Sequence, residues 1–348
     1  METCLIFTFH SPLQLSDYSF FDIGKKKPYF DEAHTHQRFK SNYKSIFKPA
    51  INGILDLLTR RDFKCSIYMS GTFLTALHRS EPTTMDKLKK LIHDGKVTIL
   101  GGTSHESIAS LFSKSLFQYQ LIAHKKLIEQ FFGVSPTILN NTENIHYNDL
   151  LTTIEECGYK ALVTESLNWY LHGNSPYQVF KAPKHNVSIL LNQSPTPVET
   201  AKENGLITRH IDPLLATYDN WKQHIVNIMK QSEQLITAEE ALKKFKPTST
   251  YSIPMPIGRK RPQVGISSFT ENAMQKEVIT KLLLMEKKIK EALNTNLLYE
   301  LSKFTSGDYF LDMNYKTITA TEKQPYDYYI SMMNMLSDFE IKKINQLP

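Results

Sequence analysis

Residues 137–143 read TILNNTE, a short run of β-forming residues that leads into a polar turn ending in a carboxylate. Similar runs recur along the first part of the chain, and between them lie stretches with helical apolar spacing, such as residues 48–58, 84–93, 117–132 and 149–157. The strand-like runs are residues 4–9, 65–69, 97–100, 137–139, 161–164, 187–191 and 206–211. This alternation predicts βαβ units and a parallel sheet. Seven such strands in one unit favour a closed barrel.

The character of the sequence changes near residue 270. Residues 270–294, 297–304 and 326–344 have helical patterns, and the first of them opens on Thr270-Glu271-Asn272, a plausible helix cap. Residues 246–262 contain four prolines and no helical period, which is typical of a connection. We therefore predict two domains, a barrel at residues 1–262 and a helical bundle packed on it at residues 263–348.

Charge and hydropathy limit the classes of function. The formal net charge of +6 is small and spread over 348 residues, whereas nucleic-acid binding needs basic residues concentrated on one face. No stretch approaches the roughly 18 apolar residues of a membrane span. Residues 1–9 lack the basic start and the apolar length of a secretory signal. We therefore expect a cytoplasmic protein that binds neither nucleic acid nor membrane.

Polar side chains follow most of the predicted strands at the point where each strand ends. They are His10, residues 101–106, Asn140 to Glu143, Glu165 and Asp212. In a parallel barrel these ends meet at one mouth, where active sites are built. Two carboxylates at such a mouth, Glu143 and Asp212, are typical of glycoside hydrolysis. An acidic residue at a helix N-terminus also acts as a simple cap, and that alternative applies to Glu106 and Asp212.

Motifs distributed along the chain carry a resemblance to a known family. They are Tyr18-Ser19-Phe20-Phe21-Asp22-Ile23-Gly24, Tyr29-Phe30-Asp31-Glu32, Ser70-Gly71-Thr72, Ile108-Ala109-Ser110-Leu111, Thr142-Glu143, Gly158-Tyr159-Lys160 and Thr305-Ser306-Gly307-Asp308. These motifs resemble glycoside hydrolase family 57, in its α-amylase-like branch. The resemblance implies a distorted seven-stranded (β/α) barrel followed by a C-terminal helical domain. It also implies retaining chemistry on an α-1,4-glucan or oligosaccharide, and we expect no cofactor and no metal.

The resemblance also assigns roles to single residues. Glu143 matches the nucleophile of the motif after the fourth strand, and Asp212 matches the general acid/base after the last strand. His10 matches the histidine of the first motif. The histidine of the motif after the third strand either becomes Glu106 or shifts to His105. Together with Asn140, the residues His10, His105 and Glu106 are the expected substrate-binding residues.

Several neighbours of the two catalytic positions differ from the family pattern. Asn140 stands where an arginine is usual, Gly102 where a glutamate is expected, and Leu214 where the Asp-x-Glu motif has its second carboxylate. Such neighbours set the charge and orientation of catalytic carboxylates. Two interpretations follow: an active retaining enzyme that uses Glu143 and Asp212, or a catalytically weak or inactive relative that binds a glycan or a protein partner. A separate hypothesis is that Glu106 has taken over the role of a lost carboxylate.

Two other motifs could bind a ligand, but each is also explained by a solvent-exposed loop without one. His34 and His36 have a spacing that metal binding could use, but a solvated loop pair is the simpler reading. Arg259-Lys260-Arg261 could indicate an anionic or phosphorylated glycan, whereas a solvated basic loop needs no ligand.

Overall fold

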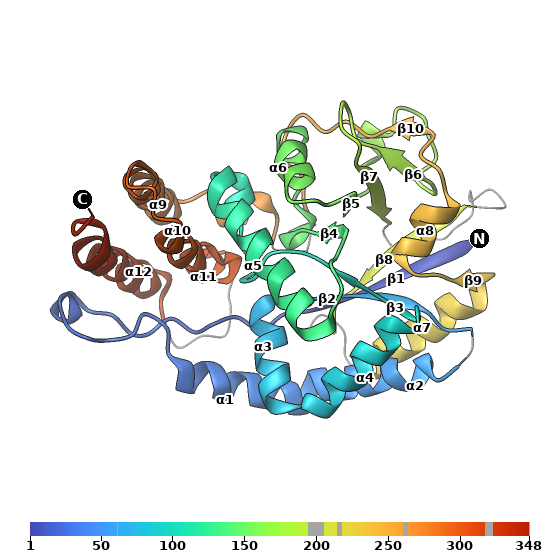
Figure 1. Ribbon diagram of the computed structural model, residues 1–348, viewed down its shortest axis with the longest axis horizontal. Coiled ribbons are helices and arrows are strands. Elements are labelled where there is room, and N and C mark those ends of the chain that lie inside the picture. Colours follow the sequence, from blue (N-terminus) through green and yellow to red (C-terminus); the bar gives the residue numbers. More distant parts are fainter. Residues whose placement is uncertain (61, 194–204, 214–217, 260–263, 317–322, 348) are drawn as a thin grey trace.

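The computed structural model describes residues 1–348 except residues 61, 194–204, 214–217, 260–263, 317–322 and 348. Within the described residues, seven parallel strands form the ring that the sequence predicts (Figure 1). They are β1 (Glu2–Phe9), β2 (Cys65–Met69), β3 (Val97–Leu100), β4 (Ile138–Asn140), β5 (Ala161–Glu165), β7 (Ser188–Asn192) and β8 (Leu206–Ile211). Each predicted run overlaps one of these strands to within one or two residues at its ends, and the α/β fold class with a mostly parallel sheet is confirmed.

The ring closes unevenly, which is the distortion of this barrel. Strands β8, β1, β2 and β3 pair over several residues each, as do β4, β5 and β7. By contrast, the link from β3 to β4 is the bridge between Leu139 and Gly101, the residue just after β3. Among the described residues, a single backbone register pair, Asn192 with Thr208, joins β7 to β8. The strands β6 (Val179–Lys181), β9 (Gln234–Leu235) and β10 (Ser249–Thr250) extend the sheet and were not predicted, because two or three residues carry no readable period.

Helices surround the barrel on its outside. They are α1 (Glu32–Asn42), α2 (Lys48–Leu58), α3 (Gly71–Ser80), α4 (Pro82–His93), α5 (Lys114–Phe132), α6 (Leu151–Glu156), α7 (Tyr218–Gln231) and α8 (Ala238–Lys244). The bounds of α2 match the prediction because its apolar stripe is wide and buries five residues. Helix α1 was not predicted, since Phe39 is its buried residue and the rest of its sequence is polar.

The C-terminal region is helical, as expected. Its helices are α9 (Ala273–Glu291), α10 (Thr295–Ser302), α11 (Gly307–Asp312) and α12 (Pro325–Phe339), and Figure 1 shows them gathered beside α5. The cap of α9 is Asn272, whose side chain accepts from the Gln275 amide. Apolar side chains of α5 and of α9 to α12 belong to one hydrophobic core, so the region packs on the barrel. The predicted boundary at residues 262 and 263 lies outside the described residues. In the described part of the chain, no helix is long and apolar enough to cross a bilayer.

A buried carboxylate on α12 fixes the loop that follows β1. Asp338 is inaccessible to solvent, and its Oδ1 accepts from the Gly24 amide at 2.6 Å. Its Oδ2 accepts from the Tyr29 hydroxyl at 2.8 Å and pairs with Lys342 Nζ at 2.8 Å. Burial raises the pKa of Asp338, but the hydrogen bonds from Lys342, Gly24 and Tyr29 outweigh it, so the pKa is lowered.

Replacing Asp338 with asparagine should lower the free energy of unfolding by about 3 kcal/mol, because its buried partners lose a charged acceptor. Chemical denaturation measures the change, and Asp86→Asn on the exposed face of α4 is the matched control. The depressed pKa means that the contribution is present above the ordinary carboxyl range and is lost as the pH falls. The variant should therefore show a smaller acid-induced loss of stability than the wild type, and equal losses would contradict this role.

Candidate active site

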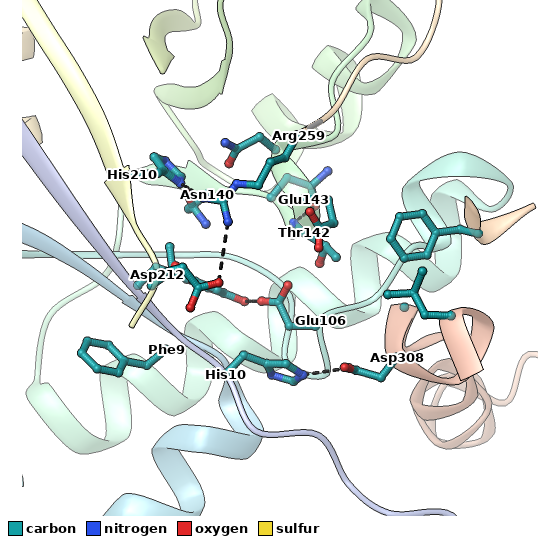
Figure 2. A pocket seen from close by; sticks show the side chains of 17 residues that line it. Phe9, His10, Glu106, Asn140, Thr142, Glu143, His210, Asp212, Arg259 and Asp308 are labelled. Carbon is teal, nitrogen blue, oxygen red and sulfur yellow. Dashed lines mark hydrogen bonds and ion pairs between the residues drawn. The ribbon is translucent and has the colours of Figure 1, made fainter. Parts of the chain in front are cut away.

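The carboxyl ends of the barrel strands enclose a cavity of about 160 Å³ (Figure 2). Its lining includes His10 after β1, Glu106 after β3, Asn140 and Glu143 at the end of β4, and Asp212 after β8. These residues are far apart in sequence and meet because parallel strands end at the same edge of a barrel. The side chains of Glu106, Asp212 and Glu143 point toward the same space, with His10 and Asp308 alongside. The structure thus brings five of the six expected site residues together.

His105 is the expected residue that the structure puts elsewhere. It lines a separate pocket of about 360 Å³, beside Tyr299. Its backbone amide donates to Gln120 Oε1 at 2.9 Å, and burial lowers the pKa of its imidazole to about 3. Between the two alternatives for the motif after β3, the residue that enters the cavity is Glu106. Glu106 does not cap a helix, since the short helix that follows begins at Ala109 and has Ile108 at its N-cap position.

The backbone of Glu143 adopts a strained conformation. Its φ of 49° and ψ of 25° lie in the left-handed region, which costs a non-glycine residue about 1–2 kcal/mol. Contacts on both sides hold the turn: Thr142 Oγ1 bonds Thr103 Oγ1 at 2.7 Å, and the Glu143 carbonyl accepts from the Arg259 amide at 2.6 Å. Strain of this kind is concentrated at functional sites, where surrounding contacts keep a side chain in one direction. Here it directs a carboxylate into the cavity.

His10 lies in a hydrogen-bonded chain between the barrel and the C-terminal region. Its Nδ1 bonds Ser70 Oγ at 2.8 Å, and its Nε2 pairs with Asp308 Oδ2 on α11 at 2.8 Å. Burial lowers the pKa of His10, but the charge and hydrogen bond of Asp308 outweigh it, with smaller contributions from Glu106 and Asp212. The pKa of His10 is therefore raised, which favours the imidazolium form at the edge of an acidic cavity.

Replacing Asp308 with asparagine should lower the pKa of His10, because the opposite charge nearest to the imidazole is removed. A nuclear magnetic resonance titration of the histidine ring signals measures it, with Asp327→Asn on the exposed start of α12 as the control. A His10 titration that is the same in wild type and Asp308→Asn would contradict the assigned pairing.

Arg259 contacts both proposed catalytic residues, Glu143 through the backbone and Asp212 through the side chain. Its backbone amide holds the Glu143 carbonyl, and its Nη1 lies 3.8 Å from Asp212 Oδ2. Its Nη2 donates to His210 Nδ1 at 3.0 Å, so the His210 proton is on Nε2 and the ring is neutral. Burial and then the Arg259 charge lower the pKa of His210, in agreement with that tautomer. The neighbours Lys260 and Arg261, and Leu214 near Asp212, lie outside the described residues.

Asp308, Arg259 and His210 are among the charged or titratable residues of the cavity that had no role assigned from the sequence. Asp308 is 298 residues from its partner His10, and no spacing rule connects them. Arg259 was noted only as part of a basic run. His210 had a readable signal, since it precedes Asp212 by two residues and alternation along a strand puts both on one face. Asn140 is buried, and its Oδ1 has no hydrogen-bond partner among the described residues.

The described residues contain no group of three or more histidine, cysteine, aspartate or glutamate side chains arranged to hold a metal ion. Glu106, Glu143, Asp212 and Asp308 lie against two basic groups, Arg259 and His10.

Comparison with known proteins finds a matching family and a similar protein. The model of the glycosyl hydrolase family 57 matches residues 4–204, more than half of the chain. A protein of Methanocaldococcus jannaschii named "Putative alpha-amylase" is 23% identical over 366 residues, which cover 90% of this chain and 78% of the relative.

Solved structures agree in fold. A GH57-type branching enzyme from Pyrococcus horikoshii superposes with a TM-score of 0.71 at 11% identity, covering 97% of this chain and 88% of the other. A 4-alpha-glucanotransferase from Thermococcus litoralis gives a TM-score of 0.68 at 14% identity, covering 89% of this chain and 56% of that longer chain.

Proposed function

Because this chain belongs to glycosyl hydrolase family 57, we propose that it is a retaining enzyme that hydrolyses or transfers α-1,4-glucans. Glu143 is the proposed nucleophile and Asp212 the proposed general acid/base. The observation that carries the proposal is that these two carboxylates, from the ends of β4 and β8, line one cavity. The alpha-amylase, branching-enzyme and glucanotransferase names of the relatives support α-glucan as the substrate class.

The proposed reaction has two steps. In the first, Glu143 attacks the anomeric carbon, and Asp212 gives its proton to the leaving glycosidic oxygen. In the second, Asp212 takes a proton from water or from a sugar hydroxyl, which displaces Glu143 from the anomeric carbon. Water as acceptor gives hydrolysis, and a sugar hydroxyl gives transfer. Two inversions at the same carbon retain its configuration.

Arg259 affects the protonation of Asp212 that the first step requires. A guanidinium 3.8 Å from a carboxylate stabilises the ionised carboxylate, whereas the first step needs Asp212 in its protonated form. Substrate binding must therefore weaken the contact between Arg259 and Asp212 before the leaving group departs. His10 contributes its charge rather than a free donor, since both of its ring nitrogens are already bonded to protein.

The same arginine favours a second candidate function. If Arg259 stays on Asp212 when a glycan binds, no protonated acid is available, and the protein is a catalytically weak or inactive relative that binds a glycan. Such a protein would have the same fold and bind the same class of ligand, but it would not cleave the glycosidic bond.

Incubation of the purified protein with maltoheptaose and with soluble glycogen tests both candidates. Chromatography of the products identifies hydrolysis by shorter oligosaccharides alone, and transfer by shorter and longer ones together. Calorimetric binding of maltoheptaose without any product supports the second candidate. Neither binding nor product formation would rule out both.

A further inference from the structure

A second cavity adjoins the candidate active site, and the proposed reaction does not use it. Its volume is about 360 Å³, and it is bordered by the loop after β1, α1, α3, the turn after β3, α5 and α10. Two of its residues were singled out in the sequence: His36, as part of a histidine pair, and His105, as an expected active-site residue. The second cavity therefore collects side chains with binding chemistry that have no part in the proposed reaction.

The two cavities share their walls. His105 lines the second cavity, and the next residue, Glu106, lines the active-site cavity, with its left-handed φ of 47° turning the chain between them. At another wall, Ser70 Oγ bonds His10 Nδ1 at 2.8 Å and Thr72 Oγ1 at 3.0 Å, and Thr72 lines the second cavity. A chain of hydrogen bonds thus joins the second cavity to His10 in the active site.

Polar groups around the second cavity are left without protein partners in the described part of the chain. His105 is buried and its Nδ1 contacts the Gln120 amide group at 3.2 Å, while its Nε2 bonds no described residue. The His36 ring, the Arg79 guanidinium and the Glu32 carboxylate also form no hydrogen bond or ion pair with a described residue. A ligand can therefore hydrogen-bond these groups without breaking a contact within the protein.

The chemistry of the lining favours a small neutral ligand that carries hydroxyl groups. Arg79 and Glu32 have opposite charges, and burial lowers the pKa of His105 to about 3, so its imidazole offers no charge to an anion. A hydroxyl both donates and accepts, so it satisfies His105 Nε2 in either neutral tautomer. The rings of Tyr299 and Phe30 add apolar faces against which a sugar ring can pack.

The size of the second cavity limits the length of that ligand. Small-molecule pockets span roughly 300–1,000 Å³, and a cavity of about 360 Å³ is at the lower end of that range. One or two sugar rings fit this space, whereas a long glucan chain does not.

We propose that the second cavity is a binding site for a maltose-sized sugar, separate from the active site. The inference rests on the proposed function for the choice of glucose units, because the lining itself specifies only a small neutral polyhydroxyl compound. His105 Nε2, Arg79 and Glu32 hydrogen-bond the hydroxyls of the sugar, and the Tyr299 ring packs against one of its faces. Maltose is a product of α-1,4-glucan hydrolysis, so the protein would meet this ligand as its own product.

A nuclear magnetic resonance titration with maltose tests the inference. The histidine ring signals, assigned by substituting each histidine, report on the second cavity through His36 and His105 and on the active site through His10. The His36 and His105 signals should shift with a saturating dependence on maltose. Arg79→Ala and Tyr299→Leu should each raise the maltose concentration at half saturation about tenfold at these two histidines. Neither substitution should change the response of His10.

The matched controls are Lys87→Ala on the exposed face of α4 and Tyr315→Leu at an exposed tyrosine, and both should titrate like wild type. Arg79→Ala removes an exposed side chain without a protein partner, so it tests the site even if Tyr299→Leu disturbs the fold. No shift of His36 and His105 at roughly 50 mM maltose, which saturates even a site of millimolar affinity, would overturn the inference. Shifts that Arg79→Ala and Tyr299→Leu both leave unchanged would also overturn it.

The outcome also separates this inference from the proposed function. A protein that converts maltoheptaose but shows no response of His36 and His105 to maltose would keep the proposed function and lose the second site. A protein that neither binds nor converts maltoheptaose, but whose His36 and His105 signals respond to maltose in the expected way, would keep the second site and lose the proposed function.

Discussion

Replacing Glu143 with glutamine should reduce the turnover of maltoheptaose by roughly 10⁴-fold or more. An amide is a poor nucleophile, so the covalent glycosyl ester of the first step does not form. The shape of the side chain is kept, and the strained turn is held by backbone and threonine contacts that the substitution does not touch. Binding of maltoheptaose should therefore remain within a few fold of wild type. Kinetics and calorimetry on the same preparation separate the two effects.

Glu155→Gln is the matched control for this experiment. Glu155 lies exposed on α6, where it accepts from His185 Nδ1 at 2.8 Å, away from the cavity. The same change of carboxylate to amide at this site should leave turnover close to that of wild type. A Glu143→Gln protein that kept more than a tenth of the wild-type activity would contradict the role of Glu143.

Replacing Asp212 with asparagine should lower the turnover of maltoheptaose by roughly 10³-fold, because the glycosidic oxygen then leaves without a proton. The loss should depend on the leaving group. Fluoride departs without protonation, so the first step on α-maltosyl fluoride should be slowed far less than the reaction of the natural linkage. Pre-steady-state release of fluoride and steady-state hydrolysis of maltoheptaose measure the two quantities.

The pH profile gives a second readout of the same residue. The alkaline decline of turnover that a general acid imposes should disappear in Asp212→Asn. Equal losses on the fluoride and on maltoheptaose, with the alkaline decline still present, would mean that Asp212 acts through binding or folding instead of proton transfer.

The barrel could be predicted from the sequence because each strand has a local signature. The runs are short, apolar and bounded by polar turns, and parallel strands in a ring force their ends to converge. The same reasoning predicts that His10, Asn140, Glu143 and Asp212 lie near one another, and all four line one cavity. The resemblance to family 57 carried by the motifs is likewise confirmed by the family match over residues 4–204.

The sequence does not predict the contacts of the site that form when segments far apart in the chain pack together. Asp308 reaches His10 because α11 packs against the barrel mouth, and Arg259 reaches Asp212 through a proline-rich connection with no period to read. The choice between His105 and Glu106 depends on one left-handed residue in a turn, which decides which side chain enters the cavity. A single φ angle of this kind has no signature in composition or spacing.

Trapping the covalent intermediate tests the proposed chemistry most directly. The protein is incubated with 5-fluoro-α-maltosyl fluoride, a slow substrate analogue whose glycosyl ester persists, and its peptides are then analysed by mass spectrometry. We expect a single added fluoromaltosyl group on the peptide that contains Glu143, and no label in Glu143→Gln. A label on Glu106, Asp212 or Asp308, or an unlabelled protein that still converts maltoheptaose, would contradict Glu143 as the nucleophile of a retaining enzyme.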